Sequence, residues 1–283
     1  MPHAQGPVAF AVPPGAPLDL TAIDPSDTGG VNRQQAEAEF AALGQRLDAL
    51  QEVLYAAKVN AVLVVLQGLD TAGKDGTVRH VMASVSPQGC RVESFKQPTP
   101  DELAHDFLWR VHQVTPARGM ITIFNRSHYE DVLVARVHEL VPEAVWRPCY
   151  EQINAFESLL AANGTIIVKF FLHVSKGEQR QRLQERQADK DKAWKLSPTD
   201  WVERRAWDAY INAYEEALQR CSTAAAPWYV VPADHKWYRN YLVAKTLAAT
   251  CERYEPAWRT RAEAIGQDML RQIQESAAHR GGG

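Results

Sequence analysis

A short glycine-bracketed turn in the first third of the chain has the residue types and spacing of a phosphate-binding site. Residues 68–74 read G-x-x-x-x-G-K and lie between a predicted strand and a predicted helix. The glycines let consecutive backbone amides face an anion, the helix start adds partial positive charge, and Lys74 can reach phosphate oxygens. The predicted phosphate- or nucleotide-binding residues of this turn are Gly68, Ala72, Gly73, Lys74, Asp75, Gly76 and Thr77. A glycine-rich turn with an incidental lysine is the alternative interpretation.

Two acids accompany the lysine of this turn. Asp75 stands where the usual motif has Ser or Thr, and Asp70 lies inside the loop. Carboxylates beside bound phosphates repel them unless a cation intervenes, so the pair predicts Mg²⁺ bridging protein and phosphate. Asp75 alone has a second interpretation, because an acid in the first turn of a helix also complements the helix dipole.

Polar residues also follow a second apolar strand, over residues 120–125. Asn125 and Arg126 end this strand, and Arg136 follows ten residues later. Ligands of α/β sheets bind at the carboxyl ends of the strands, so this turn should face the phosphate loop. Asn125 is a candidate contact to a metal-bound water, and the forked guanidinium groups of Arg126 and Arg136 suit phosphate. Arg136 could instead only decorate a helix face.

Further cations follow the other strands. Lys96 comes just after the strand at 90–95, and Arg180, Arg182 and Arg186 follow the strand at 165–174. Arg182 and Arg186 share a helical face, whereas Arg180 points elsewhere. Lys195 lies in residues 186–200, a charged segment with a tryptophan and a proline that we predict to be a mobile lid. A solvated basic face is the alternative for Arg180 and Arg182.

The elements that position these residues alternate along the chain. Apolar strands are predicted at 61–67, 90–95, 120–125, 165–174 and 228–233. Helices are predicted at 32–58, 73–85, 100–113, 176–188, 199–220 and 237–254, with further helical stretches between 128 and 163. Five strands separated by helices indicate a parallel α/β sheet covered on both faces. We expect an extended arm over residues 1–31, one domain over 32–257 with the lid at about 186–200, and a helical or disordered tail over 258–283.

Charge and cysteine usage exclude several classes of protein. A formal net charge of -3 argues against a surface that grips nucleic acid or anionic membrane throughout. The four cysteines are far apart in sequence, which fits neither a zinc site nor a disulfide framework. With no apolar run suited to a signal peptide or membrane span, we expect a cytoplasmic protein. We also expect it to form a homo-oligomer.

Five segments together closely resemble the polyphosphate kinase 2 family: "GLDTAGKDGT", "FKQPTPDEL", "IFNRSHYEDVLVARV", "FFLHVSKGEQRQRLQER" and "APWYVVPADHKWYRNYLV". The resemblance spans about residues 33–255. It implies a thymidylate-kinase-like P-loop kinase fold with a helical lid. It also implies Mg²⁺-dependent phosphoryl transfer between inorganic polyphosphate and AMP, ADP, ATP and other nucleotides.

The resemblance also implies residue roles. The family's loop acids and lysine match Asp70, Lys74 and Asp75, and its second-motif arginines match Arg126 and Arg136. The expected catalytic residues are Asp70, Lys74, Arg126, Arg136 and Arg186, and the expected metal contacts are Asp70, Asp75 and, through water, Asn125. Many members have Asp where this chain has Asn125. The Asn in this chain therefore removes a negative charge from the expected metal site. The chain is similar to the subgroup that accepts both nucleoside mono- and diphosphates.

Two other functions fit the same loop. An ATP-dependent nucleoside or nucleotide kinase would be active with ATP and inactive with polyphosphate. A non-catalytic nucleotide-binding regulatory protein would bind nucleotide without transfer that depends on Lys74.

Overall fold

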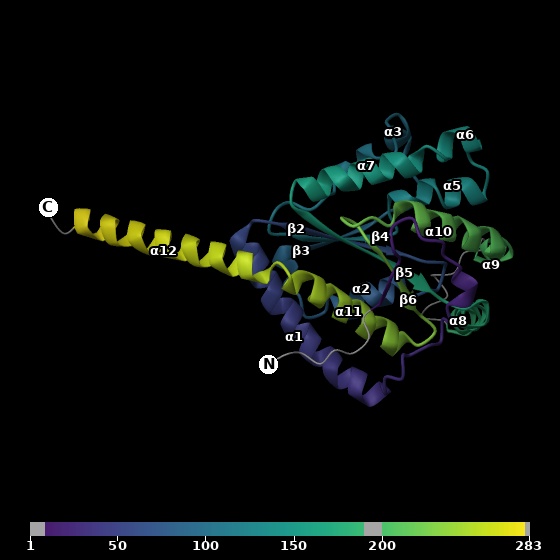
Figure 1. Cartoon of the computed structure of the whole chain (residues 1–283), viewed down its shortest axis with the longest axis horizontal. Helices are drawn as coiled ribbons and strands as arrows, with labels where there is room; N and C mark the ends of the chain where they lie inside the picture. The colour runs from purple at the N-terminus through teal and green to yellow at the C-terminus, as the bar shows by residue number, and fades with distance from the viewer. Residues whose placement is uncertain (1–8, 190–199, 281–283) are drawn as a thin grey trace.

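A six-stranded sheet forms the centre of the molecule, as seen in a computed structural model that describes residues 9–189 and 200–280 (Figure 1). Its strand order is β1-β6-β5-β2-β4-β3, and all neighbours are parallel except β1 and β6. The strands are β1 (Phe10–Ala11), β2 (Ala61–Gln67), β3 (Cys90–Ser94), β4 (Ile121–Asn125), β5 (Thr165–His173) and β6 (Trp228–Pro232). β2, which precedes the glycine turn, therefore lies between β5 and β4.

The five predicted parallel strands all form, but the predicted count of five was wrong by one. The additional strand, β1, pairs antiparallel with β6 through Phe10 opposite Val230 and Ala11 opposite Tyr229. Its two residues are both exposed, and they lie in a proline-rich arm with no alternating pattern to mark a strand. Pairing with the backbone of a distant edge strand, rather than local propensity, defines it.

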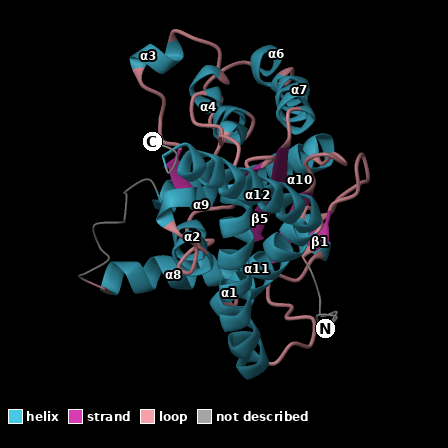
Figure 2. Cartoon of the chain, turned by 90° about the vertical axis from the view of Figure 1, so that its left-hand side faces the viewer, coloured by secondary structure: helices cyan, strands magenta, loops and turns pink. Residues whose placement is uncertain are grey.

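Helices cover both faces of the sheet (Figures 1 and 2). One face carries α1 (Arg33–Ala57), α2 (Lys74–Val81) and α11 (Lys236–Glu252), and the other carries α7 (Cys149–Ala162) and α10 (Trp207–Cys221). The remaining helices are α3 (Pro100–Leu103), α4 (Trp109–His112), α5 (Val134–Val137), α6 (Glu143–Trp146), α8 (Lys176–Ala188), α9 (Asp200–Arg205) and α12 (Glu255–Arg280). Three short 3-10 helices, η1 (Leu20–Ala22), η2 (Pro87–Gly89) and η3 (His128–Asp131), complete the described elements.

Several predicted helices are shorter or broken in the structure. The helix predicted at 100–113 forms as α3 and α4, separated by a break around Asp106, whose side chain accepts a hydrogen bond from the backbone of Leu108. Such Asx turns compete with helical hydrogen bonding. The predicted lid is described only in part: residues 186–188 end α8, and residues 190–199 lie outside the described part of the chain.

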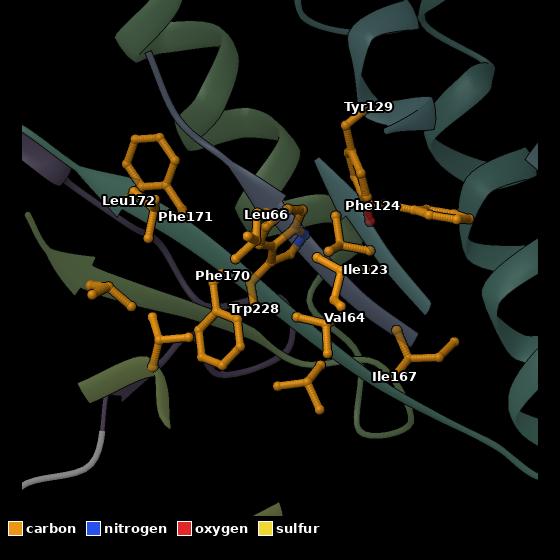
Figure 3. Packing of buried hydrophobic residues seen from close by; sticks show 14 of the residues in the cluster. Val64, Leu66, Ile123, Phe124, Tyr129, Ile167, Phe170, Phe171, Leu172 and Trp228 are labelled. Atoms are coloured by element: carbon orange, nitrogen blue, oxygen red, sulfur yellow. The ribbon is translucent and has the colours of Figure 1, made fainter. Parts of the chain in front are cut away.

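The core is built from apolar side chains on both faces of the central strands (Figure 3). Every residue of β2 is buried. Val64 and Leu66 share one face of the sheet with their strand neighbours Ile123 and Phe170. Trp228, which lies beside Lys169 and contacts the Tyr129 ring, is on the other face. A parallel strand covered on both faces must be apolar along its whole length, which is why these strands read as continuous apolar runs. The rigid sheet fixes where the loops at its carboxyl edge begin.

A buried ion pair interrupts this core. Lys169 lies in the middle of β5 with no exposed side-chain surface, and its Nζ donates to the Glu157 carboxylate. It also donates to the Tyr129 hydroxyl at 2.9 Å and to the Cys221 carbonyl at 2.6 Å. Desolvation acts to raise the pKa of Glu157, but the charge of Lys169 together with the hydrogen bonds from His128 and Lys169 outweighs it and lowers that pKa. The pair is fully hydrogen-bonded, as a buried charge must be.

The N-terminal arm and the start of α12 also pack onto this body. Val12 and Leu20 of the arm are buried, and the Ser222 hydroxyl donates to the Val12 carbonyl. α12 is anchored at its start by the buried Trp258, whose indole Nε1 donates to Asn60 Oδ1 at 2.8 Å. Beyond this anchor α12 projects away from the sheet (Figure 1). Within residues 9–189 and 200–280, no helix has the length and apolarity needed to cross a membrane.

Candidate active site

The glycine turn joins the carboxyl end of β2 to the first residue of α2. Gly68 and Gly73 have φ values of 153° and 104°, and Thr71 also has a positive φ of 65°. A Cβ added at Gly68 would lie 2.8 Å from the Leu172 carbonyl oxygen, so the loop passes close to β5. Gly73 is the N-cap of α2, and Lys74 is its first helical residue. The backbone amides at this helix start are therefore available to a bound anion, as the sequence predicts.

Lys74 is buried in the loop that precedes it. Its Nζ donates to the carbonyl oxygens of Gly68 at 2.6 Å and Leu69 at 3.3 Å. Burial, followed by the positive charge of Arg126, lowers the pKa of Lys74 to about 8, against the opposing effect of the nearby carboxylates. The loop thus holds a cation that an incoming phosphate would stabilise.

This pKa predicts a pH dependence for phosphoryl transfer at the loop. We expect kcat/KM for such a reaction to fall as the pH rises through about 8, because the neutral amine of Lys74 in the unliganded protein no longer attracts phosphate. Bound phosphate favours the charged amine and raises its pKa, so kcat should persist to higher pH than kcat/KM. Profiles of both constants from about pH 6 to about pH 10 check this. A kcat/KM that stays level across this range would contradict it.

Residues from four parts of the chain line one cavity of about 420 Å³ at the loop. Six predicted side chains meet there, from the loop (Asp70, Lys74, Asp75), the end of β4 (Arg126) and α8 (Arg182, Arg186). The predicted Gly73 and Gly76 also line it, and the other lining residues are Thr71, Arg79, Glu185, Asp189, Lys236 and Arg239. The cavity therefore has carboxylates and many cationic groups within one small volume.

Asp70 and Arg126 meet just beyond the carboxyl ends of the neighbouring strands β2 and β4. Arg126 Nη2 donates to Asp70 Oδ1 at 2.7 Å, and its Nη1 donates to Glu130 Oε2 at 3.2 Å. Parallel pairing of β2 with β4 explains the meeting, since Leu66 lies opposite Asn125 and the two strands end together. Arg126 takes a positive φ of 61°, which turns the chain sharply after β4. Burial opposes its charge, but Glu130 and Asp70 outweigh burial and raise its pKa.

Asp75 and Asn125 form a second polar pair at the same edge. Asn125 Nδ2 donates to Asp75 Oδ1 at 2.8 Å. Among the described residues, no three His, Cys, Asp or Glu side chains form a cluster suited to a metal ion. Mg²⁺ in phosphate sites typically uses one or two carboxylates, water and the substrate phosphates rather than a protein cage. The hard oxygen donors of Asp70 and Asp75, facing one cavity with Lys74, fit that pattern.

Arg182, on α8, holds the phosphate loop through hydrogen bonds to its backbone. Its Nη1 donates to the carbonyls of Thr71 at 3.0 Å and Ala72 at 3.3 Å, and its Nη2 donates to those of Ala233 and Asp234. Its Nε donates to Glu178 at 2.7 Å, so all of its donor groups already have protein partners. Arg182 thus ties the loop to the segment after β6.

The structure does not bring every predicted residue to the cavity. Arg136 lies on α5, where it donates to Glu216 of α10 at 2.6 Å and to Tyr150 at 3.2 Å and stacks on Trp146. Lys96 and Arg180 are exposed outside the lining, while Ala72 and Thr77 are buried beneath it. Gly68 shapes the turn without lining the cavity, and Lys195 lies outside the described residues.

Three cations of the lining are absent from the predicted set: Arg79 on α2, and Lys236 and Arg239 on α11. The segment "DHKWYRN", residues 234–240, follows the last strand directly. The rule that ligands bind at the carboxyl ends of strands applies to β6 as it does to β4 and β5. Applied there, it would have identified Lys236 and Arg239 from the sequence.

Replacing Gly73 tests how closely the loop fits its surroundings. A Cβ at Gly73 would lie 1.8 Å from Arg239 Nη1, whereas one at Gly30, whose φ of +73° is also positive, would meet nothing within 4 Å. Gly30→Ala should cost about 1–2 kcal/mol of unfolding free energy from backbone strain alone. Gly73→Ala should cost more and lower kcat/KM roughly 10²-fold, because Arg239 must move and the loop with it. Urea unfolding measures the stability of both variants, and steady-state kinetics measures their kcat/KM. If Gly73→Ala loses no more stability than Gly30→Ala and keeps full activity, the close packing of the loop against Arg239 is contradicted.

The fold and this cavity define an α/β protein in which a glycine-rich loop presents a buried lysine beside carboxylates and arginines. The family model described as polyphosphate kinase 2 (PPK2) matches residues 30–258. The chain belongs to the polyphosphate kinase 2 family, as its sequence motifs predict.

Named relatives agree with this assignment. An AMP/ADP-polyphosphate phosphotransferase of Meiothermus ruber is 53% identical over 245 residues, which cover 86% of this chain and 92% of that protein. An ADP-polyphosphate phosphotransferase of Rhodopseudomonas palustris is 44% identical over 82% of this chain and 84% of that protein. The crystal structure of polyphosphate kinase 2 from Arthrobacter aurescens TC1 superposes with a TM-score of 0.81 at 44% identity, covering 83% of this chain and 85% of that one.

Proposed function

We propose that the protein transfers phosphoryl groups between inorganic polyphosphate and nucleoside mono- and diphosphates, with Mg²⁺ as its metal ion. The observation that carries this proposal is the cavity at the loop, where the buried Lys74 lines the same volume as several arginines and the carboxylates of Asp70 and Asp75. Family membership and the names of the relatives support polyphosphate as the donor. A chain of phosphates also accounts for so many cations in one cavity of a protein whose net charge is negative.

The arrangement of elements supports a P-loop kinase fold of the thymidylate-kinase-like type. The five parallel strands run in the order β6-β5-β2-β4-β3, with the phosphate loop after the central β2. The segments that follow β4 and β5, the two neighbours of β2, therefore both reach the loop. A phosphotransferase needs groups from both sides because it must hold two substrates at one phosphate site.

Catalysis here requires positioning and charge rather than a strong base. The reaction breaks the bond between the terminal phosphorus and its bridging oxygen and forms a new bond from that phosphorus to an acceptor phosphate oxygen. Because that acceptor oxygen is ionised at neutral pH, no group must first remove its proton. Lys74 and Arg126, which line the cavity, would stabilise the charge that shifts onto the leaving chain. Mg²⁺, held by Asp70 and Asp75, would neutralise phosphate charge when bound.

The acceptor range follows from the relatives. The Meiothermus protein is named for both AMP and ADP, and the Rhodopseudomonas protein for ADP. The higher identity to the first favours an enzyme that carries AMP through ADP to ATP, and reversibly back.

An acceptor series tests the proposal. With polyphosphate as sole donor and Mg²⁺ present, we expect ATP to appear from both AMP and ADP, and excess EDTA to abolish it. ATP from ADP alone would keep the proposed donor and reject AMP as an acceptor. Undiminished transfer in EDTA would contradict the metal assignment.

A further inference from the structure

The cationic side of the cavity contains a buried guanidinium that has no carboxylate partner among the described residues. Arg239, in the first turns of α11, is 3% exposed. Its Nη1 donates to the Ala72 carbonyl at 3.0 Å, and its Nε and Nη2 donate to Asn240 Oδ1 at 3.1 and 2.9 Å. All of these acceptors are neutral. A buried charge that meets only neutral acceptors is unusual, because buried charges are normally paired.

A second buried guanidinium beside Arg239 adds to the electrostatic cost of its charge. Arg182, also buried, donates to the same Ala72 carbonyl and is itself paired with Glu178. Burial, followed by the positive charge of Arg182, lowers the pKa of Arg239 to about 9. The chain therefore keeps two buried guanidinium groups together at an electrostatic cost, with only one of them balanced by an acid.

The position of Arg239 explains what this charge can do. Its guanidinium packs against Gly73 and Gly76, so close that a Cβ at either glycine would lie 1.8 or 3.2 Å from its nitrogens. It lines the same cavity as Lys74 and Asp70. A neutral amide could donate to the Ala72 carbonyl without the cost of burying a charge. The positive charge becomes favourable only when a negative ligand occupies the cavity beside it.

We propose that Arg239 is a positioning residue that couples occupation of the cavity by a phosphate chain to the stability of the phosphate loop. The bound polyanion supplies the negative charge that Arg239 lacks, and Arg239 in turn holds the loop carbonyl of Ala72 in place for the ligand. The inference rests on the proposed function for the chemistry of the ligand. It assigns a role to a residue of α11, a part of the chain that contributes none of the predicted catalytic groups.

Thermal unfolding with and without sodium tripolyphosphate, at matched ionic strength, tests the coupling. The full-length wild type is compared with Arg239→Gln, which keeps a donor for Ala72 and removes the charge, and with Arg239→Lys, which keeps the charge. Arg253→Met is the matched control, because it removes an exposed arginine at the far end of the same helix. Steady-state kinetics on the same variants give KM for polyphosphate and for ADP separately.

The coupling predicts a specific pattern. Without ligand, Arg239→Gln should melt at or above the wild-type temperature, and its Tm increase with tripolyphosphate should be roughly half that of the wild type or less. Arg239→Lys should recover part of that increase, and Arg253→Met should match the wild type. KM for polyphosphate should rise in Arg239→Gln while KM for ADP changes little.

Two outcomes would overturn the inference and can be told apart. If Arg239 only stabilises the folded loop, Arg239→Gln will lower Tm equally with and without ligand. It will then keep the full Tm increase that tripolyphosphate gives the wild type. If tripolyphosphate does not stabilise even the wild type, the inference and the proposed donor both fail.

Discussion

Replacing Lys74 with methionine should lower kcat/KM by about 10²–10³-fold and leave the protein folded and at least as stable as the wild type. The amine is the buried cation of the phosphate loop, so its loss removes charge stabilisation from the transferring group. Burial already disfavours its charged form, as the lowered pKa of about 8 shows. Methionine fills a similar volume without that cost, so Tm should stay level or rise.

The control for this variant is Lys176→Met, which removes a half-exposed lysine from the start of α8, outside the cavity lining. Its kcat/KM should remain close to the wild-type value. A Lys74→Met enzyme that keeps wild-type kcat/KM would show that the loop lysine does not take part in transfer. An equal activity loss in both variants would point to a general effect of charge instead.

Replacing Lys169 with methionine should destabilise the fold by about 3–5 kcal/mol, the largest stability effect that we expect from a single side chain. The substitution leaves the Glu157 carboxylate buried opposite an apolar group, with hydrogen bonds remaining only from Tyr129 and His128. Urea unfolding measures the loss. The double variant Lys169→Met/Glu157→Leu should recover most of it, because both charges then leave the core together.

The Lys176–Asp208 pair provides the comparison, since both of its side chains are largely solvent-exposed. Lys176→Met should change the unfolding free energy by about 1 kcal/mol or less. If Lys169→Met costs no more than this, the buried pair makes no special contribution to stability. If the double variant is as unstable as the single one, lost packing rather than the unpaired carboxylate explains the effect.

The sequence predicts the sheet well because its strands are buried on both sides. A strand such as β2 must be apolar at every position, and turns rich in glycine or polar residues then mark its ends. The placement of Asp70, Asn125 and Arg126 followed from this, since the ends of parallel strands meet at one edge. β1 was not predicted because a strand of two residues is too short to show a hydrophobic pattern. It is defined only by its pairing with β6.

The directions of long side chains were the part that local sequence could not determine. Arg182 and Arg186 share a helical face, yet Arg182 turns inward because four backbone carbonyls, from the loop and from the segment after β6, converge on it. Those carbonyls are about 50 to 110 residues away in sequence. Arg136 similarly donates a hydrogen bond to Glu216, a residue of α10 that no local sequence pattern places beside it. Only the folded chain brings such partners together.

The identity of the phosphoryl donor is the central claim, and ³¹P NMR of the wild-type enzyme with AMP and Mg²⁺ tests it most directly. Two samples differ only in the donor, which is polyphosphate in one and ATP in the other. With polyphosphate, we predict that internal chain phosphate signal is lost as the resonances of ADP and then ATP grow, and that Lys74→Met abolishes this change. An unchanged polyphosphate spectrum, together with conversion of AMP to ADP in the ATP sample, would contradict the claim and identify an ordinary nucleotide kinase.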